Sequence, residues 1–274
     1  MSVSEVNQKS KMESLTVLKI GGNVIDNPQI LKSVLCDFAA WQDSRVLIHG
    51  GGKIASKLSE KLGIVPQMVD GRRITDREML DIVTMVYAGL INKNMIATLQ
   101  GYACNAVGLT GADANLIPAR KRPVKDIDYG FVGDVDPGCI SAGMLGNLLS
   151  TGLIPVVAPI THDGAGSLLN TNADTVASSV AIALAKIFRV QLVFCFEKKG
   201  VLRNPEDDDS VIDFMDEALF RQYREEGVIT AGMLPKLDNA FAALHSGVAE
   251  VRICSPDGLK AGQMGGTSVR LKHG

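Results

Sequence analysis

Short apolar runs alternate with amphipathic stretches along almost the whole chain. The runs are rich in β-branched residues and predict buried strands at 15–20, 45–48, 154–160, 191–196 and 250–254. Between them, helical spacing of apolar positions predicts helices at 28–42, 53–62, 75–100, 141–150, 173–188, 215–226 and 233–246. Such alternation is typical of an α/β protein with a mainly parallel sheet covered by helices, and it predicts that architecture here.

The connecting segments carry more local signals. Asp70-Gly71 predicts a hairpin, 106–109 and 116–118 short strands, and 129–135 a strand or hairpin. Thr75-Asp76-Arg77-Glu78 fits a capping box that opens the long helix. That helix is a candidate dimer contact because it is long, and its expected apolar face comprises Leu80, Val83, Val86, Leu90 and Ile91. In the helix at 53–62, the corresponding face comprises Ile54, Leu58 and Leu62.

Two of the predicted strands run directly into glycines. Val46-Leu47-Ile48-His49 is followed by Gly50-Gly51-Gly52 and then by a helix. Such a turn brings backbone N–H groups to a helix N-terminus, which favours an anion such as phosphate or carboxylate over a plain structural turn. The first strand, which ends in Gly21-Gly22, contains Lys19. Lysine is disfavoured in buried strands, so Lys19 lies either on an exposed edge or opposite a negative charge.

Composition narrows the class of protein. The chain has 274 residues, 46% of them hydrophobic, and a net charge of −2, so no global basic field indicates nucleic acid or an anionic membrane. No uninterrupted apolar run reaches the roughly 20 residues that span a bilayer, and the first 14 residues lack a secretion signal. Five scattered cysteines without a CxxC pair indicate reduced thiols, a cytoplasmic protein and no metal site.

Neither common nucleotide fingerprint is present. The Walker A spacing fails before Gly52-Lys53, and no GxGxxG lies between a strand and a helix. What remains is an ordered set of separated motifs. These are Lys19-Ile20-Gly21-Gly22, His49-Gly50-Gly51-Gly52, Asp70-Gly71-Arg72-Arg73-Ile74-Thr75, Ala106-Val107-Gly108-Leu109, Gly130-Phe131-Val132-Gly133, Asn170-Thr171-Asn172-Ala173-Asp174 and Gly232-Met233-Leu234-Pro235-Lys236.

From about residue 15 to the end, these motifs make the chain resemble the amino acid kinase family. The resemblance implies a three-layer αβα sandwich, with residues 1–14 as a tail, 15–188 as a lobe for the acylated amino acid and for dimerisation, and 189–274 as an ATP-binding lobe. Within the family, the motifs are similar to those of members that phosphorylate the side-chain carboxylate of N-acetyl-L-glutamate with ATP and Mg²⁺, an early step of arginine biosynthesis.

The resemblance also implies roles for individual residues. Lys19 and Lys236 would stabilise the transition state, and Asp174 would hold both lysines. The other assignments are Gly51, Gly52, Arg73, Asn170 and Asn172 for the substrate, and Gly21, Gly22, Glu197, Gly200, Thr230 and Gly232 for phosphate or nucleotide. No residue is assigned to a metal.

The chemistry fits these residue types. A glutamate side chain, with an unperturbed pKa of about 4.3, is ionised at neutral pH, so the nucleophile needs no general base. The obstacle is repulsion between that carboxylate and the polyphosphate, which fixed positive charge and N–H donors offset.

Each residue taken alone also has a plainer interpretation. Lys236 fits a solvated lysine, Asp174 a helix cap, Asn172 a loop support, His49 a structural residue, and Arg72 and Lys53 surface charges.

The chain departs from the family at three places. Lys53 stands where proline is common, and Phe196-Glu197-Lys198-Lys199-Gly200-Val201 replaces the usual Thr-Asp-Val-x-Gly-Val. Members inhibited by arginine carry an N-terminal helix that joins dimers into hexamers, whereas the tail here is short. We therefore expect a homodimer that is insensitive to arginine. Open alternatives are a succinylated substrate, another substrate of the family such as carbamate, aspartate or free glutamate, and a non-catalytic sensor of amino acids or nucleotides.

Overall fold

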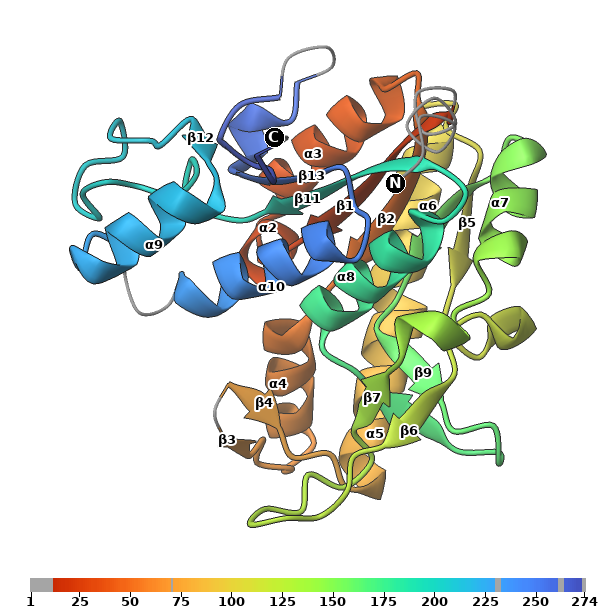
Figure 1. The fold of residues 1–274 in the computed structure, drawn as a ribbon. Helices are drawn as coiled ribbons and strands as arrows, with labels where there is room; N and C mark the ends of the chain where they lie inside the picture. The colour runs from red at the N-terminus through yellow and green to blue at the C-terminus, as the bar shows by residue number, and fades with distance from the viewer. Residues whose placement is uncertain (1–11, 70, 230–232, 261–263, 273–274) are drawn as a thin grey trace.

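A central sheet of eight strands forms the middle of the protein (Figure 1). The computed structural model describes residues 12–69, 71–229, 233–260 and 264–272. The order across the sheet is β12-β14-β13-β11-β1-β2-β8-β5, and each pairing is parallel except that between β13 and β14. The strands are β1 (Ser14–Ile20), β2 (Ser44–His49), β5 (Ala106–Leu109), β8 (Ile154–Val157), β11 (Arg189–Cys195), β12 (Phe214–Met215), β13 (Glu250–Cys254) and β14 (Thr267–Val269). The prediction of a mainly parallel sheet is confirmed.

Helices cover both faces of this sheet. One face carries α2 (Gly22–Asp26), α3 (Pro28–Ala40), α4 (Gly52–Lys61), α5 (Arg77–Thr84) and α6 (Asn92–Gly101), whose apolar residues form one core with the sheet. The other face carries α7 (Ala142–Ser150), α8 (Ala173–Leu184), α9 (Glu217–Glu225) and α10 (Leu234–His245), which form a second core. The predicted three-layer αβα sandwich is therefore confirmed.

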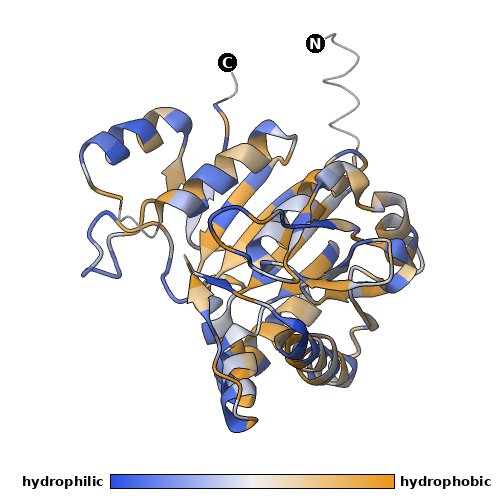
Figure 2. Cartoon of the chain, turned by 90° about the horizontal axis from the view of Figure 1, so that it is seen from below, coloured by the Kyte–Doolittle hydropathy of each residue, from blue (hydrophilic) through white to orange (hydrophobic). Residues whose placement is uncertain are grey.

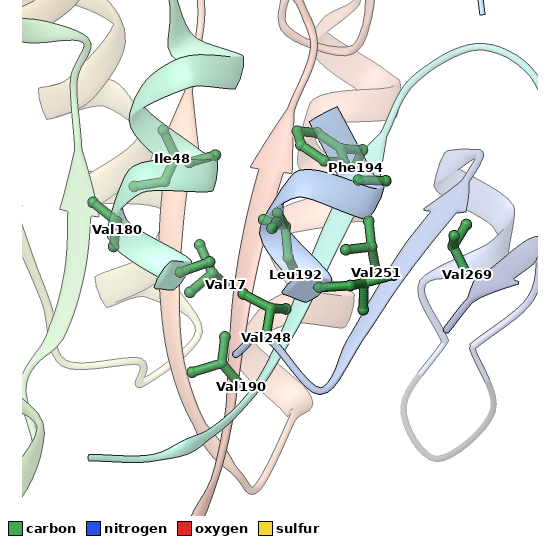
Figure 3. Packing of buried hydrophobic residues seen from close by; sticks show 14 of the residues in the cluster. Val17, Ile48, Val180, Val190, Leu192, Phe194, Val248, Val251 and Val269 are labelled. Atoms are coloured by element: carbon green, nitrogen blue, oxygen red, sulfur yellow. The ribbon is translucent and has the colours of Figure 1, made fainter. Parts of the chain in front are cut away.

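Alternation along β1 divides its side chains between the two cores. Val17 packs toward α8 and α10, whereas Leu18 packs toward the opposite helices, because successive side chains of a strand point to opposite faces. Figure 3 shows Val17, Leu192 and Val251 of three adjacent strands in a row, with Val180 of α8 next to Val17. Figure 2 shows hydrophobic strands inside and hydrophilic positions on the outer helices.

Three two-stranded sheets lie apart from the central one, at the lower end of the view in Figure 1. They pair β3 (Met68–Val69) with β4 (Arg72–Arg73), β6 (Ala119–Lys121) with β7 (Gly133–Val135), and β9 (Ile160–His162) with β10 (Leu168–Asn170). Isolated bridges, such as Thr75 to Gly130 and Val132 to Asn170, join them into one rim. The hairpin predicted near Gly71 is confirmed, and the strand or hairpin predicted at 129–135 is present as the strand β7, which begins at Gly133.

The long predicted helix is present but not regular. A π-helical segment, η1 (Met85–Ile91), separates α5 from α6 within one helix of 25 residues, Arg77–Gly101. Because a π turn holds more residues than an α turn, side chains beyond Thr84 rotate out of the 3.6-residue register. Leu90, expected on one face with Leu80, Val83, Val86 and Ile91, is consequently 53% exposed, whereas those four residues are buried. By length and composition the helix could cross a membrane, and 44% of its most apolar stretch is buried inside the protein.

Two other helices differ from prediction in detail. The N-cap of α5 is Asp76, whose side chain accepts from the N–H of Met79, whereas Thr75 is held in a bridge to Gly130 and cannot cap. In α4 the buried positions are Ala55 and Ser59, and Leu62 is exposed. Boundaries shift elsewhere by a few residues, most at α8, which ends at Leu184 rather than near 188.

Two strand predictions are wrong. The apolar run 154–160 is not one strand, because β8 ends at Val157 and Ile160 begins β9 in another sheet. Pro159, which lies between them, has no N–H to donate to a ladder. Residues 116–118 form no strand; a 3₁₀ turn at Asp113–Asn115 precedes them and β6 follows. The short strands β12 and β14 were not predicted.

Candidate active site

The two glycine turns lie side by side. β1 and β2 are adjacent and parallel, with Ile20 opposite His49, so both strands deliver their glycines to the same carboxyl edge of the sheet. Gly22 opens α2 and Gly52 opens α4, where first-turn N–H groups have no partner within the helix. The structure thus brings four predicted glycines, Gly21, Gly22, Gly51 and Gly52, to one place.

Lys19 is aimed at a negative charge and is not on an exposed edge. β1 lies in the interior of the sheet, and the Lys19 Nζ is 2.7 Å from a carboxylate oxygen of Asp174. The lysine side chain is 11% exposed and the aspartate side chain 39%. The ion pair is half open, so one side of the ammonium stays accessible.

The carboxylate of Asp174 is available for Lys19 because another residue caps the helix. Asn172 is the N-cap of α8, and its side chain accepts from the N–H groups of Asp174 and Thr175. The interpretation of Asp174 as a cap is therefore wrong, whereas that of Asn172 as a local support is confirmed. Asp174 also lies in the first turn of α8, where the helix dipole attracts negative charge.

The second glycine turn fits closely against the long helix. Gly51 has a φ of +150°, and a Cβ at this position would stand 2.2 Å from the Cδ1 of Ile91 and 3.2 Å from the Cδ1 of Tyr87. Only glycine fits such an approach. The main-chain atoms of the turn therefore line the site without a side chain in front of them.

Arg73 is fixed to the same turn. Its Nη2 donates to the carbonyl oxygen of Gly52 at 2.9 Å and to the hydroxyl of Ser56 at 2.7 Å. Tyr87 lies beside it; burial raises the pKa of the Tyr87 hydroxyl, and the charge and hydrogen bonding of Arg73 oppose that rise. The guanidinium of Arg73 is thus buried and held in place, and it puts a positive charge next to the N–H groups of the glycine turn.

Asn170 reaches the site from β10. Its side-chain amide donates to the hydroxyl of Thr75 at 3.0 Å, and its backbone N–H donates to the carbonyl oxygen of Phe131. Asn170 and Arg73 therefore flank one cavity of about 220 Å³, which we call the glycine cavity. Its lining includes Lys19, Gly22, Gly50, Gly51, Gly52, Arg73, Tyr87, Val132, Pro159, Asn170, Asn172 and Asp174.

A second cavity, of about 680 Å³, adjoins the first, and we call it the Lys236 cavity. Its lining includes Gly21, Asn23, Lys53, Phe194, Phe196, Glu197, Lys236 and Asn239. Both cavities share Lys19, Gly22, Gly52, Gly71, Arg72, Asn172 and Asp174. Lys19 and Asp174 therefore stand where the two cavities meet.

Lys236 faces the shared region from α10. Its ammonium lies 3.8 Å from the centre of the Phe196 ring. Burial and the nearby Lys19 charge lower the pKa of Lys236, and Asp174 opposes this shift. Two ammonium groups from opposite parts of the chain thus converge near one carboxylate. In the described residues, however, the ion pair of Asp174 is with Lys19, and Lys236 rests on an aromatic ring instead.

Not every predicted residue lies in these cavities. Glu197 lines the Lys236 cavity, but Gly200 does not; it packs against Thr267, where a Cβ would stand 2.7 Å from the hydroxyl oxygen. Thr230 and Gly232 lie outside the described residues. His49 is buried and bonded to Gly50 and Asn92, in agreement with a structural role.

Residues 14–255 match the family described as the amino acid kinase family. The chain belongs to the amino acid kinase family. It is 57% identical over 249 residues to an acetylglutamate kinase of Cytophaga hutchinsonii, covering 90% of this chain and 94% of that one. It is 52% identical to an acetylglutamate kinase of Bacteroides fragilis, covering 96% and 99%, and 38% identical to one of Methanopyrus kandleri, covering 93% and 100%.

Solved structures of other proteins have the same amino acid kinase fold. An N-acetylglutamate synthase of Neisseria gonorrhoeae aligns with a TM-score of 0.79 at 22% identity, covering 100% of this chain and 64% of that one. A carbamate kinase of Giardia lamblia aligns with a TM-score of 0.65 at 14% identity, covering 96% and 100%. At these identities the likeness concerns the fold alone.

Sequence reasoning missed several residues at the site. Tyr87, which lines the glycine cavity, and Ser56 are unremarkable positions on helices, and only the fold shows that they contact Arg73. Arg72 was interpreted as a surface charge; it is exposed, as expected, but lines both cavities. Phe196 could have been found, because it is one of the departures from the family pattern.

Lys53 is a surface charge, as interpreted from the sequence, and Lys198 and Lys199 are exposed as well. Lys53 pairs with Asn23 and lies 3.7 Å from Asp26, whereas Lys198 and Lys199 bond Asp208 and Asp209 of the acidic loop at 204–210. The pairs of Lys198 and Lys199 hold the loop at 204–210 against residues 196–201, the stretch that departs from the family pattern.

Proposed function

We propose that the chain is an ATP-dependent N-acyl-L-glutamate 5-kinase that acts on N-acetyl-L-glutamate. It transfers the γ-phosphoryl group to the side-chain carboxylate, giving N-acetyl-L-glutamyl 5-phosphate and ADP, in arginine biosynthesis. The observation that carries the proposal is the buried Lys19 ammonium, 2.7 Å from Asp174, at the junction of two cavities. The names of the relatives, at up to 57% identity, support the choice of substrate.

In this proposal the glycine cavity holds the acylated amino acid. Arg73 binds the α-carboxylate, since a guanidinium matches a carboxylate bidentately, and Asn170 offers its amide to the substrate. Gly51 and Gly52 contribute N–H groups, and Asn172 supports the α8 N-terminus. The reacting carboxylate then points away from Arg73 and toward Lys19.

The Lys236 cavity, the larger of the two, holds ATP in this proposal. Gly21 and Gly22 border the transferring phosphoryl group, while Glu197 and Gly200 belong to the nucleotide side, with Thr230 and Gly232 assigned there by motif only. A phosphate cradle of glycines and two lysines fits a polyphosphate. Mg²⁺ bound with ATP would neutralise part of the phosphate charge; among the described residues, the carboxylates at this cavity that would hold it are Asp174 and Glu197.

The chemistry needs charge placement rather than proton transfer. The substrate carboxylate is ionised at neutral pH and attacks without a base. Lys19 approaches from the sheet and Lys236 from α10, so one can accompany the incoming oxygen and the other the leaving phosphate. Asp174 holds the Lys19 ammonium in place through their ion pair. Fixed ammonium groups of this kind favour the transition state, in which charge spreads over the moving phosphoryl oxygens.

The remaining assignments are also proposals. Residues 15–188 form the lobe for the amino acid and for dimerisation, and 189–274 the ATP lobe, although one sheet runs through both because β1 pairs with β11. We propose a cytoplasmic homodimer that binds neither nucleic acid nor membranes and is insensitive to arginine. L-Arginine added to the assay should then leave the rate unchanged.

A coupled ADP-release assay tests the activity. The purified chain is given Mg-ATP with N-acetylglutamate, N-succinylglutamate, glutamate, aspartate or carbamate, each at millimolar concentration. We expect turnover with an acylglutamate and little with the others. Comparison of acetyl and succinyl substrates by kcat/KM identifies the acyl group. Turnover with none of these compounds, together with tight binding of an amino acid or nucleotide, would indicate a sensor instead.

A further inference from the structure

The ring of Phe196 stands between the first glycine turn and α10. Phe196 directly follows β11, and its backbone N–H donates to the carbonyl oxygen of Cys254, which fixes its place at the sheet edge. Its Cβ lies 3.6 Å from where a Cβ on Gly21 would stand. On its other side, the ring centre is 3.8 Å from the Lys236 ammonium.

The contact of Lys236 differs in kind from that of Lys19. Lys19 is paired with a carboxylate, which cancels much of its field at a distance. Lys236 lies over an aromatic face, and in the described part of the chain it forms no ion pair with Asp174. An aromatic face attracts a cation through its quadrupole and carries no net charge. The ammonium therefore keeps its whole positive charge directed at the cavity.

We propose that Phe196 is a positioning residue for phosphoryl transfer. Its ring face holds the Lys236 ammonium at the cavity edge and leaves N–H groups of that ammonium free to bind phosphate. The role rests on the proposed kinase activity. The ring shields one side of the ammonium and replaces part of its lost hydration, while the opposite side stays open to the shared region of the two cavities. Phe196 itself touches neither reacting atom.

The contact can be observed without any activity. Protons on the ε-carbon of Lys236 should resonate upfield of those of other lysines, because they lie over an aromatic ring, and Lys236→Arg assigns the signal. In Phe196→Leu this shift should disappear. A Lys236 signal at the ordinary lysine position in the unmodified protein would overturn the proposal.

The role in the reaction is tested by replacing Phe196 with mono-, di- and trifluorophenylalanine, which keep the ring's shape and weaken its attraction for cations. We expect kcat to fall in steps, by about three- to thirtyfold in total, with KM for the acylglutamate and the melting temperature unchanged. Phe196→Tyr should stay near the unmodified rate. The matched control is the same series at Phe188, a half-buried phenylalanine at the other end of β11, where kcat should not change.

The outcomes separate this role from the kinase proposal. If the unmodified enzyme turns over and the Phe196 series is flat, the role of Phe196 is wrong while the kinase proposal stands. A rising kcat would mean that the ring only traps Lys236 in the ground state, which also overturns the role. If the unmodified enzyme turns over no acylglutamate, the proposed function fails and this role fails with it.

Discussion

At the scale of single residues, the site works by holding charges in different surroundings. Lys19 is buried against a carboxylate, Lys236 lies against a ring, and Arg73 is tied to the carbonyl oxygen of Gly52. Each cation is fixed by a neighbour that restricts its position and leaves one side open. Preorganised charge of this kind costs no reorganisation at the moment of transfer.

His49, by contrast, is held in surroundings that favour its neutral form. Its ring is fully buried; one nitrogen lies 2.8 Å from the carbonyl oxygen of Gly50 and the other 3.2 Å from the amide of Asn92. Burial lowers the pKa of His49 to about 4. The neutral ring thereby joins the second glycine turn to the long helix.

The pH dependence of stability should reveal this neutral histidine. The unfolded chain binds a proton at His49 below about pH 6.5 and the folded protein only below about pH 4, so stability falls as pH decreases through this window. We expect the free energy of unfolding to drop by about 2 kcal/mol between pH 7 and pH 5 from this group. Urea unfolding of the unmodified protein and of His49→Gln at both pH values measures it, and an equal drop in both would contradict the assignment.

At the scale of elements, the N-terminus of α8 decides whether Asp174 is free to bind Lys19. Asn172 satisfies two N–H groups of the first turn, so the Asp174 side chain does not have to. Sequence reasoning left Asp174 between these two roles. A helix cap and a catalytic carboxylate would each place an aspartate at the start of a helix. Only the observed hydrogen bonds distinguish these two roles for Asp174.

Removing the cap should therefore affect both stability and rate. In Asn172→Ala we expect a loss of about 1 kcal/mol of stability and a fall in kcat, because Asp174 turns toward the unsatisfied N–H groups. Asn172→Ser, which retains a capping oxygen, should recover most of both. Asn27→Ala at the N-cap of α3 is the matched control: it should cost similar stability with kcat unchanged. A normal kcat in Asn172→Ala would contradict the link to Asp174.

Some elements of the fold could be predicted from the sequence and others could not. The strands and most helices follow from the sequence because their apolar periodicity directly reflects burial on the sheet. The break after Val157 could have been predicted, because Pro159 has no N–H to donate to a ladder. The π-helical segment does not follow from the sequence, since it arises from how elements meet in three dimensions. For the same reason the glycines and Lys19 could be predicted as a site, whereas the contacts of Tyr87 and Ser56 with Arg73 could not.

At the scale of the whole molecule, positive charge is gathered where the two cavities meet, although the net charge is −2. Lys19 and Lys236 come from positions 217 residues apart, and one continuous sheet brings them together. β1 is paired on one side with β2 and on the other with β11, so residues from both proposed lobes reach the same edge.

The outer surface of the long helix carries exposed apolar side chains. Met85 and Leu90 of the π-helical segment are 55% and 53% exposed. We expect the chain to elute in size-exclusion chromatography with light scattering at about twice 29.2 kDa, and Leu90→Lys to elute as a monomer. Val124→Lys, at an equally exposed apolar residue elsewhere, should remain dimeric. A monomeric unmodified chain at micromolar concentration would contradict the proposed homodimer.

The central claim is that two ammonium groups act together on one migrating phosphoryl group. A double-mutant cycle of kcat with Lys19→Ala, Lys236→Ala and the combined variant tests it most directly, with Lys57→Ala on the exposed side of α4 as the control. We predict that each single change lowers kcat on the order of a hundredfold or more and that the double variant is little worse than the slower single one. A normal kcat in either single variant, or losses that simply multiply in the double, would contradict the account.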